Sequence, residues 1–117
     1  LDPLEEEALR RSSIHRVPAG DIGRKAAESI ARRAGTTHPL YLHLDLDVLD
    51  PSVGRANPYA APGGASLEAL VAFVAAIRAH ASLAAVTLSA YDPASDPDGR
   101  ISGAALRLAE AAVGDRG

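Results

Sequence analysis

The stretch LYLHLDLDVLDPS, residues 40–52, combines an alternating apolar pattern with three aspartates near its end. From Leu40 onward, apolar side chains recur at every second position, which is the period of a β-strand with one buried face. Polar residues occupy the positions between them, namely Tyr41, His43, Asp45 and Asp47. The pattern predicts a strand over residues 40–48 that has one apolar face and one unusually acidic face.

The segments on either side of this stretch alternate between helical and strand-like patterns. Helices are predicted over residues 3–12, 20–35, 67–81 and 101–114 from their apolar spacing, with Ser66 as the cap of the third. Further strands are predicted over residues 14–17 and 83–91. Because strands that alternate with helices form parallel sheets through crossover connections, we expect an α/β fold, a three-layer α/β/α arrangement with a parallel sheet.

The acids at the end of the predicted strand are candidates for a metal site. Residues i and i+2 of a strand point the same way and lie about 6–7 Å apart, so Asp45 and Asp47 are expected to converge. Ligands of parallel sheets usually bind at the carboxyl ends of strands, and paired carboxylates favour hard cations such as Mg²⁺, Mn²⁺ or Ca²⁺. We expect His43 to be a hydrogen-bonding neighbour, and Asp50, just before Pro51, to bind backbone amides of a turn. The alternative is that Asp47 also serves only the turn.

Composition excludes several other classes of protein. The chain has 117 residues, a net charge of −3 and no cysteine, which predicts one globular unit without disulfides or a cysteine nucleophile. No basic run supports nucleic-acid binding, and the longest apolar run, residues 69–77, is too short to span a membrane. We therefore expect a cytoplasmic protein. The other histidines are expected to be solvated or capping, and no serine has a histidine arranged beside it as a general base; these histidines are His15, His38 and His80.

Three motifs together resemble a known family. They are HLDLDVLDPS at residues 43–52, RANPYAAPGG at 55–64 and LSAYDPASDPDGR at 88–100. Together they are similar to the C-terminal part of the arginase and agmatinase (ureohydrolase) family. The resemblance implies an arginase-like fold and a binuclear Mn²⁺ site in which Asp45 and Asp47 are metal ligands. It also implies hydrolysis of a guanidino compound such as arginine or agmatine by a metal-bridging hydroxide, and assembly into homo-oligomers, either trimers or hexamers.

The chain departs from the family pattern in two respects. The GGDH-like and DAHxD motifs that carry the family's other metal ligands are absent from residues 1–117. Many members also carry a glutamate that grips the guanidinium group at the position of Ala90, in SAYDP, and Asp92 is expected to be a turn residue rather than its substitute. Because the chain opens at Leu1 on LDP, we expect it to be the C-terminal portion of a single arginase-like domain, inactive when isolated.

Two other interpretations remain open from the sequence. A DxD motif at a strand end is also typical of haloacid-dehalogenase-like phosphatases, but these need a basic residue after the motif, and Lys25, the one lysine, precedes it. The third interpretation is a truncated, inactive remnant or an interaction module, whose short sheet would have open edges.

Overall fold

The fold is that of a computed structural model, which describes residues 1–35 and 38–114. The helices are α1 (Pro3–Arg11), α2 (Arg24–Ala34), α3 (Leu67–His80) and α4 (Arg100–Val113), and the strands are β1 (Leu40–Asp45) and β2 (Leu83–Ser89). Three short 3₁₀ helices connect them: η1 (Ala19–Asp21), η2 (Leu46–Val48) and η3 (Pro93–Ser95). Among the described residues, no helix is both long enough and apolar enough to cross a bilayer.

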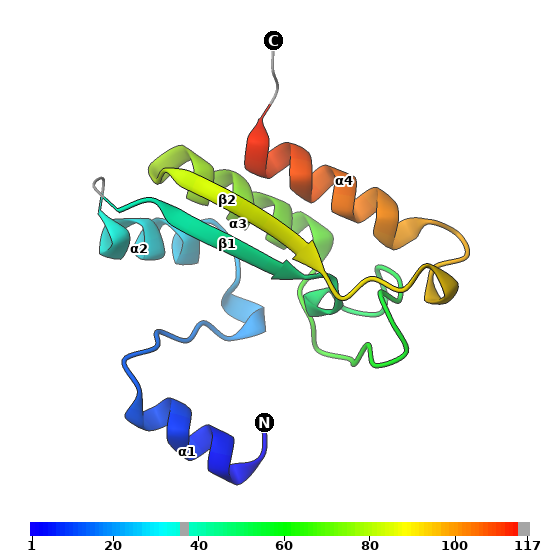
Figure 1. Ribbon diagram of the computed structural model, residues 1–117, viewed down its shortest axis with the longest axis horizontal. Helices are drawn as coiled ribbons and strands as arrows, with labels where there is room; N and C mark the ends of the chain where they lie inside the picture. Colours follow the sequence, from blue (N-terminus) through cyan, green and yellow to red (C-terminus); the bar gives the residue numbers. More distant parts are fainter. Residues whose placement is uncertain (36–37, 115–117) are drawn as a thin grey trace.

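The two strands lie side by side and run in the same direction. β1 and β2 form a parallel pair in which Leu44 lies opposite Leu88 and Asp45 lies opposite Ser89. Helix α3 connects the end of β1 to the start of β2, as parallel pairing requires (Figure 1). The predicted α/β class with a parallel sheet is confirmed.

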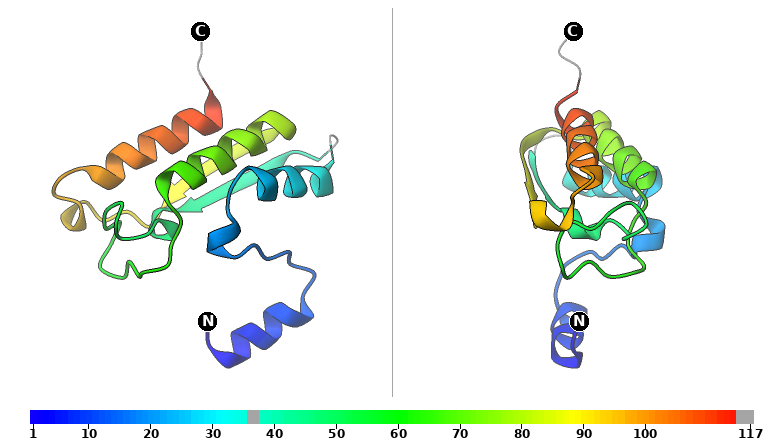
Figure 2. Two further views of the ribbon diagram at one scale, coloured as in Figure 1. Left: turned by 180° about the vertical axis from the view of Figure 1, so that it is seen from behind. Right: turned by 90° about the vertical axis from the view of Figure 1, so that its right-hand side faces the viewer.

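The helices α2, α3 and α4 lie against one face of this sheet, which the side view of Figure 2 shows. On the opposite face, β1 carries Tyr41, His43 and Asp45, and the Tyr41 side chain is 63% exposed. Within the described residues no element covers that face. The acidic strand face predicted from the sequence is therefore the open face of the sheet.

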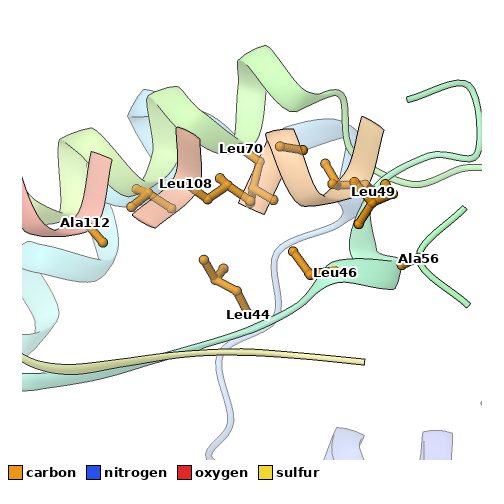
Figure 3. Close-up of a cluster of buried hydrophobic side chains, with 10 residues drawn as sticks. Leu44, Leu46, Leu49, Ala56, Leu70, Leu108 and Ala112 are labelled. Carbon is orange, nitrogen blue, oxygen red and sulfur yellow. The ribbon is translucent and has the colours of Figure 1, made fainter. Parts of the chain in front are cut away.

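The core lies between the sheet and the helices. Leu44 from β1 and Leu46 from η2 point toward Leu70 of α3 and Leu108 of α4 (Figure 3). A smaller cluster, formed by Ala27, Ala76 and Ile77, joins α2 to α3. Burial of these apolar side chains holds the strand ends against the helices, because removing apolar surface from water is the main favourable term in folding.

Capping residues define the helix starts as the sequence predicted. Asp2 accepts hydrogen bonds from the backbone N–H groups of Leu4 and Glu5, and Ser66 accepts one from Ala69. Helix α1 has no buried residue and projects away from the sheet and the other helices (Figure 1). Its stability depends on local interactions, including the capping box with Glu5.

Two expectations about strands are wrong. Residues 14–17 form no strand, because among residues 1–35 and 38–114 no strand lies beside them to complete a ladder, and Ile14 is exposed. The strand that begins at Leu40 ends at Asp45 instead of residue 48, because its partner β2 ends at Ser89 and pairing cannot continue. The next three residues form the 3₁₀ turn η2, so Asp47 lies in a turn rather than in a strand.

Candidate metal centre

The candidate residues lie where both strands end. Asp45 and Ser89 are the last residues of β1 and β2 and are paired in the ladder. The loop of residues 51–65 and the connection of residues 90–99 extend from the same edge of the sheet (Figure 1). This edge is where ligands of parallel α/β folds usually bind.

Asp45 is held by two side chains. The hydroxyl of Ser89 donates a short hydrogen bond to Asp45 Oδ1, and Nε2 of His43 lies 2.9 Å from the same oxygen. The Ser89 hydrogen bond, followed by that of His43, lowers the pKa of Asp45 below the ordinary value of an aspartate. The side chain is 55% exposed, so Asp45 presents an ionised carboxylate to the open side of the sheet at neutral pH.

These contacts show which ring nitrogen of His43 carries a proton. Ser89 Oγ lies 3.2 Å from His43 Nε2 and donates its single proton to Asp45. Ser89 Oγ can therefore only accept a hydrogen bond from the histidine, and the Asp45 carboxylate likewise can only accept one. Nε2 of His43 must therefore carry a proton. The prediction that His43 is a hydrogen-bonding neighbour is confirmed.

Asp47 is half-buried and is held by a residue that the sequence did not single out. Asn57, in the loop of residues 51–65, donates from Nδ2 to Asp47 Oδ2 over 3.3 Å and to the carbonyl of Ala90 over 2.9 Å. Its Oδ1 accepts the backbone N–H of Tyr59 at 2.9 Å. Asn57 therefore links η2, which follows β1, to the residue that follows β2. In the sequence, Asn57 stands out only as part of an Asn-Pro dipeptide, which predicts a turn but says nothing about contacts with distant residues.

The chain turns sharply after β2. Ala90 has a φ of 65°, in the left-handed region that a non-glycine residue seldom adopts. Asp92 then caps η3, accepting the N–H of Ala94 at 3.0 Å, and Ser95 Oγ donates to it at 3.2 Å. The prediction that Asp92 is a turn residue is confirmed.

Asp50 also has the predicted turn role. Its two carboxylate oxygens accept the backbone N–H of Ser52 at 2.9 Å and that of Gly63 at 3.0 Å. The hydrogen bonds from Ser52, followed by that from Gly63, lower the pKa of Asp50. Asp50 therefore holds the two ends of the loop of residues 51–65 together.

The donor set suits a hard divalent cation but is incomplete. Asp45 and Asp47 offer carboxylate oxygens, which Mg²⁺, Mn²⁺ and Ca²⁺ prefer. Within residues 1–35 and 38–114, no group of three or more histidine, aspartate or glutamate side chains is placed to hold a metal ion. The two carboxylates thus fit part of a metal site, whose other ligands would have to come from outside the described residues. Their assignment as ligands remains a prediction.

The remaining histidines do not join this site. His80 ends α3, with Nε2 3.8 Å from Glu28 Oε1, and it therefore lies toward the start of β2 rather than its end. His15 and His38 are exposed and precede β1 in the sequence.

Comparison with known proteins identifies the family. The family model described as "Arginase family" matches residues 1–114. The chain belongs to the arginase family. Comparison with curated protein sequences gave no match. Membership of the arginase family removes the basis for a haloacid-dehalogenase-like phosphatase, which rested on the DxD pattern alone.

Solved structures of arginase-family enzymes share the fold. Arginase from Bacillus subtilis is similar with a TM-score of 0.88 and 20% identity, covering 98% of this chain and 41% of the arginase. A hypothetical agmatinase from Burkholderia thailandensis has a TM-score of 0.69 and 27% identity, covering 75% of this chain and 28% of the other. Formimidoylglutamase from B. subtilis has a TM-score of 0.61 and 28% identity, covering 66% and 24%. The chain therefore spans less than half the length of the structures it resembles.

Proposed function

We propose that this chain contributes part of the active site of a metal-dependent hydrolase of the ureohydrolase type, which cleaves a C–N bond of a small guanidino or amidine compound. Asp45 and Asp47 are the metal ligands in this proposal, and two Mn²⁺ ions are the cofactor. The observation that carries it is the pair of carboxylates at the carboxyl end of β1, one of them ionised and exposed, in a chain of the arginase family.

The residues of this chain have defined parts in such a site. Asp45 and Asp47 would hold the cations through their carboxylate oxygens, and Asp50 would keep the following loop closed over the edge of the sheet. Bound metal ions of this kind lower the pKa of a water ligand and stabilise a tetrahedral intermediate. At this site the described residues offer two carboxylates, which are too few ligands for two metal ions. We therefore propose that residues 1–117 are the C-terminal portion of one arginase-like domain, whose remainder supplies the other ligands. Assembly into a trimer or hexamer is part of the same proposal.

Substrate choice depends on Ala90. Ala90 matches the family position at which many members carry a glutamate that grips a guanidinium group, and its methyl group cannot pair with a cation. Asp92 is not a replacement, because both of its oxygens are engaged by Ala94 and Ser95. We therefore propose that recognition of the guanidino or amidine group relies on groups other than an acid at position 90, and that arginine and agmatine are two substrates to test among related compounds.

The proposal is tested with the full-length polypeptide that carries these residues. The full-length polypeptide is assayed after removal of metal and after addition of Mn²⁺. Urea release is measured with arginine and agmatine, and formamide release with formimino compounds. We expect activity to require the metal and to fall by several orders of magnitude in Asp45→Asn and Asp47→Asn. Asp98→Asn is the matched control, because Asp98 is an exposed acid in the connection after β2. Full activity of the doubly substituted Asp45→Asn, Asp47→Asn protein would contradict the proposal.

A further inference from the structure

Each of the two predicted ligands has one oxygen engaged by a side chain from another element. Asp45 Oδ1 accepts the hydroxyl of Ser89, which ends β2, and Asp47 Oδ2 accepts the amide of Asn57, from the loop of residues 51–65. In the described part of the chain, Asp45 Oδ2 and Asp47 Oδ1 accept no hydrogen bond. Each carboxylate is therefore anchored on one side and open on the other.

The anchors are themselves held in place. The Asn57 amide has a defined orientation, because Oδ1 accepts from Tyr59 N and Nδ2 donates to the Ala90 carbonyl. The neighbouring backbone is fixed as well, since the N–H of Asp92 donates to the carbonyl of Ala56 at 2.7 Å. These bonds direct an N–H group of Asn57 toward Asp47.

Ser89 is held by the sheet. It is half-buried and occupies the last ladder position of β2, opposite Asp45. Its hydroxyl lies between the Asp45 carboxylate and His43 Nε2, so it donates to the acid and accepts from the imidazole. The rotamer of Ser89 is therefore determined by two contacts rather than one.

We propose that Ser89 and Asn57 are positioning residues for the metal, fixing one oxygen of Asp45 and of Asp47 so that the other faces the cation. This inference rests on the proposed function. The physical reason is that a carboxylate with a fixed orientation loses less rotational freedom when it binds an ion than a freely rotating one. Hydrogen-bonding partners of metal ligands commonly change metal affinity by about 10–100-fold when they are replaced.

The experiment measures Mn²⁺ affinity rather than activity. The full-length polypeptide is stripped of metal and titrated with Mn²⁺, and the electron paramagnetic resonance signal of the free aqueous ion reports binding. We expect Ser89→Ala and Asn57→Ala each to weaken binding by at least about tenfold. Ser89→Thr, which keeps the hydroxyl, should bind more tightly than Ser89→Ala. Ser95→Ala is the matched control, because Ser95 also donates to a carboxylate, that of Asp92, which is not a predicted ligand.

The outcomes separate this inference from the proposed function. If Asp45→Ala and Asp47→Ala weaken Mn²⁺ binding but Ser89→Ala and Asn57→Ala bind like the wild type, the positioning inference is wrong and the ligand assignment stands. If those two variants only lower the melting temperature of the metal-free protein, their role is structural and the inference is also wrong. If Asp45→Ala and Asp47→Ala leave Mn²⁺ binding unchanged, the proposed function itself fails. Weakening in both pairs of variants, with Ser95→Ala unchanged, supports the inference.

Discussion

Replacing Gly64 with alanine should disturb the turn that carries Asp47. The backbone around Gly64 runs directly against η2 and the two residues after it, where Ala65 N donates to Val48 O and Asp50 N donates to Ala65 O, each at 2.9 Å. A Cβ atom on Gly64 would lie 2.5 Å from Val48 O, 2.6 Å from Asp50 N and 2.8 Å from the carbonyl carbon of Leu49. All three are backbone atoms, so the strain cannot be relieved by turning a side chain.

The expected loss of stability follows from this geometry. Forcing extra atoms into a packed site costs about 1–3 kcal/mol. The two bridging hydrogen bonds that would have to lengthen contribute about 0.5–1.5 kcal/mol each. We therefore expect Gly64→Ala to lower the free energy of unfolding by about 2–6 kcal/mol, the upper end applying if both hydrogen bonds are lost. Because Val48 follows Asp47 in η2, its displacement should also weaken Mn²⁺ binding.

The assay is urea unfolding of the full-length polypeptide, followed by far-ultraviolet circular dichroism. Gly103→Ala is the control of opposite sign, because Gly103 lies within α4 and a Cβ there would meet no atom within 4 Å. Alanine is favoured over glycine inside helices, so this variant should gain about 0.5–1 kcal/mol. A Gly64→Ala protein as stable as the wild type would refute the reasoning about close backbone approach.

Three further predictions concern single side chains. Leu108 is 0% exposed, so Leu108→Ala should lower the free energy of unfolding by about 2–5 kcal/mol in urea titrations. Leu106 is 67% exposed, so Leu106→Ala should change it by less than about 0.5 kcal/mol. Burial alone would raise the pKa of Asp96, but the backbone N–H groups of Ile101 and Ser102 and the Tyr91 hydroxyl donate to it and lower the pKa overall. Ionised Asp96 should therefore stabilise the fold fully at pH values above its pKa in the unfolded chain, about 3.9, and this contribution should be lost as the pH falls through its lower pKa in the folded protein. Asp96→Asn should accordingly reduce the fall of the melting temperature at acid pH. Asp50→Ala should speed proteolytic cleavage within residues 51–65, and an unchanged cleavage rate relative to Asp98→Ala would contradict the role of Asp50 in closing the loop.

The sequence predicted the regular elements well where the deciding interactions are local. Helix α3 begins after Ser66, as the capping pattern required, and the alternation from Leu40 predicted which face of β1 is buried. Both signals depend on residues within a few positions of one another. The turn roles of Asp50 and Asp92 were predicted on the same basis, because an aspartate beside a proline commonly binds nearby backbone amides.

The errors occurred where the outcome depends on a distant partner. The apolar patch at residues 14–17 had strand-like composition, but the described part of the chain offers it no strand to pair with. Strand β1 ends at Asp45, opposite Ser89, the last residue of β2. The role of Asn57 was not foreseen for the same reason, since its partners Asp47 and Ala90 are 10 and 33 residues away. No periodic pattern reports contacts of that kind.

The sequence by itself determined the helices, the parallel α/β class and the acidic end of β1, because periodicity, capping and turn chemistry act over a few residues. The tertiary structure alone decided how the acids are held. Parallel register places Ser89 beside Asp45, and the closed loop brings Asn57 to Asp47, so the orientation of both carboxylates depends on segments that meet only when the chain is folded.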